Sequence, residues 1–202
     1  LADKHGVNFD GALTWAFEFE DQPYFAGFRA LGSNGLDLPV LNVFRMFSMM
    51  GGERVAATST AEVPLDVIVK SGVRQRPDVG AFSSFDGHRL CVMVWHYHDD
   101  DIAGPDADVS LTLAGLGART GPATLSHYRV DGDHSNCYTA WKKLGSPIAP
   151  NEKQYAELEQ AGKLAPLEAP AKIQLVQGST TVKFTLPRQG VSLLVVDVPA
   201  TN

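Results

Sequence analysis

The chain has 202 residues, 44% of them hydrophobic and 20% charged, which is enough for the core of one domain or slightly more. A formal net charge of −6 provides no broad basic face for phosphates, and no apolar run reaches the roughly 20 residues of a membrane span. We therefore expect no nucleic-acid partner and no membrane partner. The start at Leu1, with neither an initiator methionine nor a signal peptide, predicts that the chain begins partway through a longer polypeptide or after a cleavage.

The first fifty residues have the pattern of a single strand–loop–helix unit. Residues 11–20 are a dense apolar and aromatic run, which predicts a buried strand that ends in carboxylates. A loop with an Asn34-Gly35 turn follows, and a helix is expected from about Leu38, with Asp37 as its cap and Gly51-Gly52 at its end. The apolar stripe of this helix is expected at Leu38, Leu41, Phe44 and Phe47. Because a parallel strand cannot be buried alone, the unit is expected to be the end of a larger α/β fold.

From about residue 53 the hydrophobic period changes to two. Residues 89–97 and 191–198 are apolar on both parities and are expected to be central strands covered on both faces. Six further segments are expected to be strands: 54–60, 79–85, 109–113, 124–130, 173–176 and 181–186. The pattern predicts a mainly β fold, with an antiparallel β-sandwich over residues 53–202.

A long insertion, at about residues 131–169, interrupts the strands. It contains Trp141 and a predicted helix over residues 151–162, where Asn151 and Gln154 form a capping-box pair. Loops of this length in compact domains are usually functional or pack on a neighbour. We therefore expect the insertion to pack along an adjoining domain or to take part in an oligomer contact.

Trp15, Glu18 and Glu20 are the strongest candidates for a binding site. An indole face packs on the apolar side of a sugar ring, and carboxylates accept hydrogen bonds from hydroxyls, so the trio suits a carbohydrate subsite. The residue types alone fit a core tryptophan followed by solvent-facing acids better. As a catalytic pair on one strand face, Glu18 and Glu20 would have Cβ atoms about 6.6 Å apart, from the ~3.3 Å rise per residue. Catalytic carboxylates must flank the scissile bond from different directions, which disfavours this pairing.

The run from His96 to Asp101 has the composition of a metal site, with two imidazoles followed by three carboxylates. A strand that ends in a solvated acidic turn explains it better, because the mixture selects no class of cation. We expect no metal and no cofactor. His127 and His134 have no partner at useful spacing and are expected to be ordinary core or surface histidines, and Cys91 is expected to be a small buried hydrophobe.

The segments ALTWAFEFEDQPYFAGFRAL, residues 12–31, and NGLDLPVLNVFRMFSMMGGERV, residues 34–55, resemble the end of the barrel in glycoside hydrolase family 39, the β-xylosidase family. Residues 127–164 resemble a signature of that family's β-sandwich domain, Asn-x-Tyr/Trp-x-x-Trp-x-x-x-Gly-x-Pro. The signature residues are Asn136, Tyr138, Trp141, Gly145 and Pro147. The resemblance covers essentially the whole chain.

The resemblance implies a (β/α)₈ barrel followed by a β-sandwich, and retaining hydrolysis of terminal xylosyl residues by two glutamates. Residues 1–52 correspond to the last β/α unit of the barrel, so both catalytic glutamates are expected upstream of Leu1. Trp15 matches the family's eighth-strand tryptophan beneath the bound xylose, and Glu18 or Glu20 matches an acid that binds sugar hydroxyls. In related barrels this tryptophan precedes a cis non-proline peptide, so we expect a cis bond between Trp15 and Ala16.

The expected partners are a xylo-oligosaccharide substrate and the upstream barrel of the same polypeptide. The sequence does not decide whether the protein forms a homo-oligomer. One alternative is a non-catalytic carbohydrate-binding or structural β-sandwich module, which the expected burial of Trp95 and Tyr97 disfavours. Another is an α-L-iduronidase activity within the same family. No cation lies near Trp15 before Arg29, which favours xylose over a uronate. The compartment stays open between a bacterial cytoplasm and a periplasm.

Overall fold

The computed structural model describes residues 6–8, 11, 17–27 and 30–199 of the chain. Within them the fold is mainly antiparallel β, as predicted, with a few short helices. The strands are β1 (Gly32–Ser33), β2 (Leu36–Asp37), β3 (Glu53–Val55), β4 (Asp78–Phe85), β5 (Arg89–Tyr97), β6 (Ala107–Leu113), β7 (Gly121–Val130), β8 (Ala171–Leu175), β9 (Thr180–Leu186) and β10 (Gly190–Asp197). The helices are α2 (Pro39–Ser48), α3 (Leu65–Ser71), α4 (Cys137–Lys143) and α5 (Glu152–Gly162).

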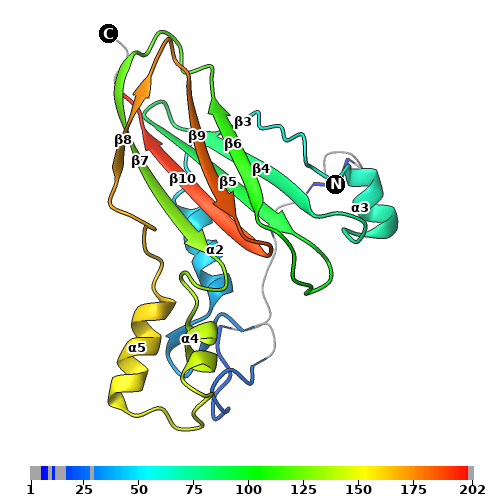
Figure 1. Cartoon of the computed structure of the whole chain (residues 1–202), viewed down its shortest axis with the longest axis vertical. Helices are drawn as coiled ribbons and strands as arrows, with labels where there is room; N and C mark the ends of the chain where they lie inside the picture. Colours follow the sequence, from blue (N-terminus) through cyan, green and yellow to red (C-terminus); the bar gives the residue numbers. More distant parts are fainter. Residues whose placement is uncertain (1–5, 9–10, 12–16, 28–29, 200–202) are drawn as a thin grey trace.

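Two antiparallel sheets pack face to face. Six strands form one sheet in the order β3-β4-β5-β10-β7-β8, and β6 pairs with β9 in a two-stranded ribbon in front of it (Figure 1). Side chains of alternate residues on β5 and β10 fill the space between the layers, and Leu113 and Leu186 of the ribbon meet them. The buried residues at the centre of this core are Leu90, Val92, Val94, Leu194 and Val196. The eight strands expected after residue 53 are present, although β3 ends at Val55 instead of about residue 60.

The other face of the six-stranded sheet is covered by α2. Met46 is fully buried against Cys91, Met93, Leu193 and Val195, which alternate with the residues of the first core along β5 and β10. The two central strands are therefore buried on both faces, and the expectation drawn from their apolar parities is confirmed.

The predicted stripe and cap of α2 are wrong. The buried residues of the helix are Asn42 and Met46, whereas Phe44 and Phe47 are 48% and 49% exposed. A series spaced by three drifts around the helix, so it does not stay on the face that meets the sheet. Asp37 does not cap the helix, because its carboxylate pairs with Arg45 at 2.7 Å.

Two helices, α3 and α4, were not expected from the sequence. The helix α3 follows Pro64, has no side-chain cap and contains three β-branched residues, so it carries no start signal and little propensity. The helix α2 ends at Ser48, before the Gly51-Gly52 pair that was expected to end it.

The insertion at residues 131–169 forms a small lobe below the sheets, where α4 and α5 pack beside the β1–β2 hairpin (Figure 1). The predicted capping box of α5 is present, since Gln154 N–H donates to Asn151 Oδ1 at 2.9 Å and Gln154 Oε1 accepts from Asn151 N–H at 3.0 Å. Leu36, Cys137 and Leu158 form the buried core of this lobe. The insertion therefore packs on residues close to the amino-terminal segment.

The predicted strand at residues 11–20 is only partly within the described residues. Gly11 and residues 17–20 are not in a strand, and residues 12–16 lie outside the described part of the chain. None of the described helices combines the length and apolar character needed to cross a bilayer.

Candidate functional site

Of the three predicted sugar-binding residues, Glu18 and Glu20 lie within the described residues. Trp15 and its peptide bond to Ala16 lie outside them. Glu18 is half-buried, and its Oε1 accepts a hydrogen bond from Gly35 N–H at 2.9 Å. Glu20 is exposed. Since residues 17–20 do not form a strand, the argument that placed both carboxylates on one strand face does not hold.

The β1–β2 hairpin holds the segment that carries Glu18. The N–H groups of Leu31 and Gly32 both donate to the carbonyl oxygen of Phe17, at 2.8 and 2.7 Å. The Asn34-Gly35 turn that joins the two strands has positive φ at both residues, as the sequence predicted for a turn. This conformation directs Gly35 N–H to the Glu18 carboxylate. The loop therefore fixes one oxygen of Glu18.

The insertion in turn holds the hairpin. Tyr155 on α5 donates its hydroxyl hydrogen to Asn34 O at 3.1 Å, and Cys137 Sγ on α4 lies 2.9 Å from Asp37 O. Gly162 lies so close that a Cβ there would be 3.0 Å from Asp37 O. Segments about 100 residues apart in the sequence thus form one packed unit.

Asn42 on α2 is the central polar residue of this unit, and no pattern in the sequence pointed to it. Its side chain is fully buried, and its Nδ2 donates to Ser135 O at 2.9 Å and to Gly162 O at 2.6 Å. Its Oδ1 accepts from Arg45 at 2.8 Å. Only a side chain with both donors and an acceptor satisfies these three groups.

The signature residues shape the turn after α4. Asn136 caps that helix by accepting from Thr139 N–H at 3.2 Å, and Trp141 Nε1–H donates to Pro147 O at 3.0 Å. Gly145 between them has φ +85°, a conformation that favours glycine. The sequence pattern is therefore explained by local structure.

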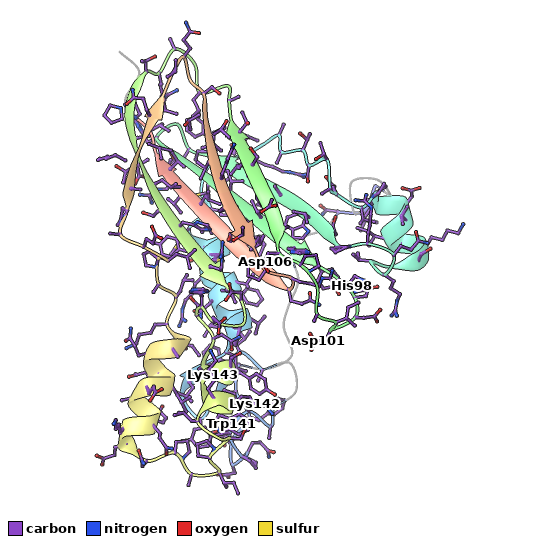
Figure 2. The ribbon with its side chains drawn as sticks, viewed as in Figure 1. His98, Asp101, Asp106, Trp141, Lys142 and Lys143 are labelled. Carbon is purple, nitrogen blue, oxygen red and sulfur yellow. The ribbon has the colours of Figure 1, made fainter. Side chains whose placement is uncertain are left out.

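An aromatic group lies where α4 meets the loop that follows Glu20. The ring of Phe25 is 4.9 Å from that of Trp141 and 5.5 Å from that of Tyr138. Lys142 Nζ lies 5.5 Å from the centroids of both Trp141 and Tyr138. Tyr138 is 42% exposed, so part of this surface faces solvent. Figure 2 shows Trp141 and Lys142 in the lobe, away from His98 and Asp101.

Contacts with backbone groups hold both histidines of the His96–Asp101 run, and both are buried. Asp100 N–H donates to His98 Nδ1 at 3.0 Å, so His98 Nε2 carries the hydrogen that is donated to Arg74 O at 3.0 Å. His96 Nδ1 lies 2.9 Å from Leu186 O. In the part of the chain that the structure describes, no three His, Cys, Asp or Glu side chains are grouped to hold a metal.

The other singled-out histidines do have partners, which corrects the expectation. His134 Nδ1 lies 2.8 Å from the carboxylate of Asp131. His127 Nε2 lies 2.9 Å from Ser192 Oγ, and burial together with the charge of Arg129 lowers the pKa of His127 to about 4. A turn brings His134 to Asp131, and the pairing of β7 with β10 brings His127 to Ser192. Spacing in the sequence alone did not show either contact.

Cys91 is a small buried residue, as predicted, and burial raises the pKa of its thiol. Trp95 is partly buried, and its Nε1–H donates to Asp78 Oδ2 at 2.6 Å. Tyr97 is 45% exposed, which corrects the expected burial. It is the last residue of β5 and alternates with Cys91 and Met93, so it lies on the face of the sheet that α2 covers, at the end of the strand.

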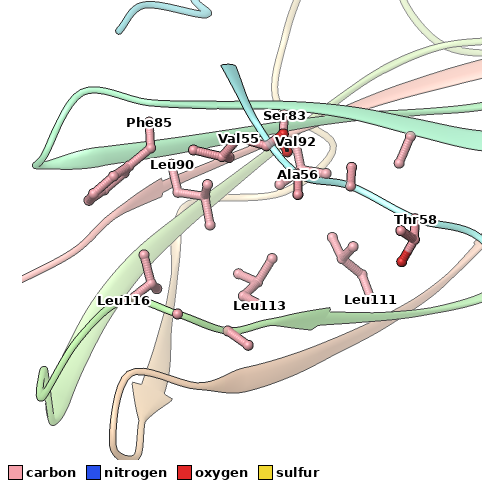
Figure 3. Close-up of a pocket in the computed structure, with 14 residues that line it drawn as sticks. Val55, Ala56, Thr58, Ser83, Phe85, Leu90, Val92, Leu111, Leu113 and Leu116 are labelled. Atoms are coloured by element: carbon pink, nitrogen blue, oxygen red, sulfur yellow. Dashed lines mark hydrogen bonds between the residues drawn. The ribbon is translucent and has the colours of Figure 1, made fainter. Parts of the chain in front are cut away.

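A cavity of about 270 Å³ opens between the layers beside β6 (Figure 3). Its walls include Val55, Leu90, Leu111, Leu113 and Leu116, and the fourteen lining residues contain no charged side chain. Such a cavity has no group for acid–base catalysis.

The fold is shared with solved glycoside hydrolases. A monomeric β-xylosidase from Caulobacter crescentus CB15 is 19% identical with a TM-score of 0.68, over 91% of this chain and 36% of that one. A family 39 enzyme from Xanthomonas axonopodis pv. citri is 15% identical with a TM-score of 0.63, over 81% of this chain and 31% of that one. A bacterial orthologue of human α-L-iduronidase is 19% identical with a TM-score of 0.65, over 83% of this chain and 28% of that one. The chain thus spans about a third of the length of these relatives.

A search of curated proteins finds no match. The model of the family described as glycosyl hydrolases family 39 matches residues 6–178. This match covers well over half of the sequence, and the chain belongs to glycosyl hydrolases family 39.

Proposed function

We propose that this chain is the carboxyl-terminal part of a retaining glycoside hydrolase that releases terminal xylose from xylo-oligosaccharides. The match to family 39 over residues 6–178 carries the proposal. In the complete enzyme, a nucleophile in a preceding barrel attacks the anomeric carbon, and an acid in the same barrel protonates the leaving oxygen. Residues 1–52 contribute the last β/α unit of that barrel, and residues 53–202 form the accessory β-sandwich with its insertion at 131–169.

The surface of α2 supports a preceding domain. Val40, Phe44 and Phe47 are 44%, 48% and 49% exposed, and their spacing of four and three places them on one helix face. This face lies opposite the buried residues Asn42 and Met46, and of its three side chains Phe47 has a ring contact with Phe82 on β4, at 6.4 Å between centroids. Three half-exposed apolar side chains on one face are typical of a surface that another element covers.

The proposed sugar site comprises Trp15, Glu18 and Glu20, with Trp15 as the floor beneath the terminal sugar. Glu18 is the better positioned of the two acids, because Gly35 N–H holds one carboxylate oxygen. Its second oxygen, Oε2, lies beside Gly32, and in this proposal it accepts from a sugar hydroxyl. Glu20, which is exposed, has the lesser role.

The test compares the complete polypeptide with this chain alone on an aryl β-xyloside. The 202-residue chain should show no turnover, because it lacks both catalytic glutamates, and measurable hydrolysis by it would contradict the proposal. In the complete polypeptide, Glu18→Gln should lower kcat/KM by roughly tenfold or more, from the loss of a hydrogen bond to a charged group. Glu157→Gln, at an exposed glutamate of α5 outside the proposed sugar site, is the matched control and should remain within about twofold of the parent. An aryl α-L-iduronide assayed in parallel tests the alternative glycone.

A second candidate is a sugar-binding role of the accessory domain itself. The exposed ring of Tyr138 beside Trp141 favours it, because such rings stack on sugars. Affinity electrophoresis of the chain in xylan, with Tyr138→Ala as the variant, separates the two roles. Retardation that depends on Tyr138 would support a binding module, and unretarded migration would exclude it.

A further inference from the structure

A second cavity lies on the other side of the ribbon, between β7 and β9. Its volume is about 390 Å³, within the range of ligand pockets. Leu125, Leu167, Val182 and Phe184 form apolar walls, and His127 and Arg129 line it as polar groups. Because Leu125, His127 and Arg129 are alternate residues of β7, they share one strand face, which is directed at the ribbon.

The guanidinium of Arg129 is buried and incompletely neutralised. Its side chain is 9% exposed, its Nη2 donates to Thr185 O at 2.6 Å, and its Nε donates to Ser192 Oγ at 3.2 Å. Within the described residues, Nη1 makes no hydrogen bond. The nearest carboxylate oxygen, Asp131 Oδ2, is 3.9 Å from Nε.

Asp131 cannot move closer without losing its own contacts. Its Oδ1 accepts from the N–H groups of Asp133 and His134, at 2.8 and 2.9 Å, and lies 2.8 Å from His134 Nδ1. Burial lowers the pKa of Arg129 more than the charges of Asp131 and Asp106 raise it. Arg129 thus has one distant ion pair, with Asp131 at 3.9 Å, and its guanidinium carbon lies 6.0 Å from the centroid of the Phe184 ring. A mostly buried guanidinium with so long an ion pair is an arrangement to which an anionic ligand can add a closer contact.

The remaining groups around the cavity define the ligand. His127 is neutral above about pH 4 and packs edge-on to Phe184, with ring centroids 4.8 Å apart. Lys183 and Glu168 are exposed at the rim and offset each other in charge. The buried part therefore presents one cation among aliphatic and aromatic walls.

We propose that this cavity binds a small monocarboxylate with a flat apolar body, an aryl carboxylate. Its carboxylate accepts from Arg129 Nη1, and its ring lies against Phe184 and the leucines. The site is separate from the sugar-binding loop at Glu18, and its occupancy does not depend on the proposed glycosidase activity.

The test is calorimetric titration of the complete polypeptide with benzoate and with benzamide, its neutral isostere. Benzoate should bind with a Kd of about 1 mM, the strength of one charge-assisted contact plus ring burial, and benzamide at least tenfold more weakly. Arg129→Lys, which removes the planar fork, should weaken benzoate at least fivefold.

A second variant tests the proposal if Arg129→Lys does not fold. Ala171 is exposed and lies opposite Leu125 in the β7–β8 register, so Ala171→Glu adds a carboxylate at the cavity without disturbing the core. It should weaken benzoate at least tenfold, whereas Ala114→Glu, an exposed alanine at the other cavity, should leave the Kd unchanged. The proposal is overturned if benzoate and benzamide bind equally or if neither binds. It is also overturned if Ala171→Glu or folded Arg129→Lys binds benzoate with wild-type affinity. Hydrolysis is read separately, so failure of either proposal leaves the other testable.

Discussion

Replacing Asn42 by aspartate tests whether buried hydrogen bonds hold the insertion on α2. The two side chains have the same shape, but a carboxylate has no hydrogen to donate. In Asn42→Asp, the carbonyls of Ser135 and Gly162 lose their donor and face negative charge in a site with no access to water. Each unsatisfied buried group costs about 1–3 kcal/mol. Arg45, which already contacts Oδ1, recovers a part, so we expect a loss of about 3 kcal/mol.

The assay is urea denaturation of this chain at pH 7, read by tryptophan fluorescence. Asn151→Asp is the matched control, because Asn151 uses its oxygen to accept from Gln154 N–H, and aspartate caps a helix equally well. The control should change the free energy of unfolding by less than about 0.5 kcal/mol. A loss below about 1 kcal/mol in Asn42→Asp would refute the assignment of these bonds as the main polar tie.

Three further predictions concern stability and reactivity. Folding lowers the pKa of His127 from 6.5 to about 4, so the unfolded chain binds more protons between these two pH values. The free energy of unfolding should therefore fall by up to about 3 kcal/mol as the pH drops through this window. Denaturation of His127→Asn at pH 4–7 should show a weaker dependence on pH. Gly52→Ala should lower the free energy of unfolding by at least about 2 kcal/mol more than Gly87→Ala, as read by thermal unfolding. Both glycines have positive φ, but only a Cβ at Gly52 collides with the Phe85 carbonyl. Equal losses in the two variants would show that the backbone relaxes at Gly52. Burial raises the pKa of the Cys137 thiol to about 12, so iodoacetamide should fail to label it at pH 8 until urea unfolds the chain, and rapid labelling of the native chain would contradict its burial.

The sheets were predictable because their signal is local. A strand that is apolar on both parities must be covered on both sides, and β5 and β10 are the two central strands of the large sheet. The short helices α3 and α4 lacked such a signal. The expected face of α2 was wrong for a related reason, since the helix places polar Asn42 inside and Phe44 outside, which apolar spacing cannot anticipate.

The sugar-binding role of Glu18 and Glu20 stays a prediction, since their residue types suit a carbohydrate subsite but fit solvent-facing acids better. Their separate environments depend on where Gly35 lies, which the sequence alone did not show. The bonds from Asn42 to Ser135 and Gly162 span 93 and 120 residues. No periodicity extends over such distances, so a single sequence does not reveal these partners.

These distant contacts give the insertion a physical role in the proposed sugar site. Fixing each residue of a loop costs about 1–2 kcal/mol of backbone entropy, and the few hydrogen bonds between the hairpin and the Glu18 segment cannot offset this for the whole loop. The buried cluster of Leu36, Cys137 and Leu158 adds apolar burial that helps to offset this entropy, and Tyr155 donates a hydrogen bond to the hairpin turn. Leu158→Ala should therefore cost about 2–5 kcal/mol and raise KM of the complete enzyme for a xyloside, although Leu158 never meets a sugar. A stability loss with unchanged KM would show that the loop is ordered by the barrel instead.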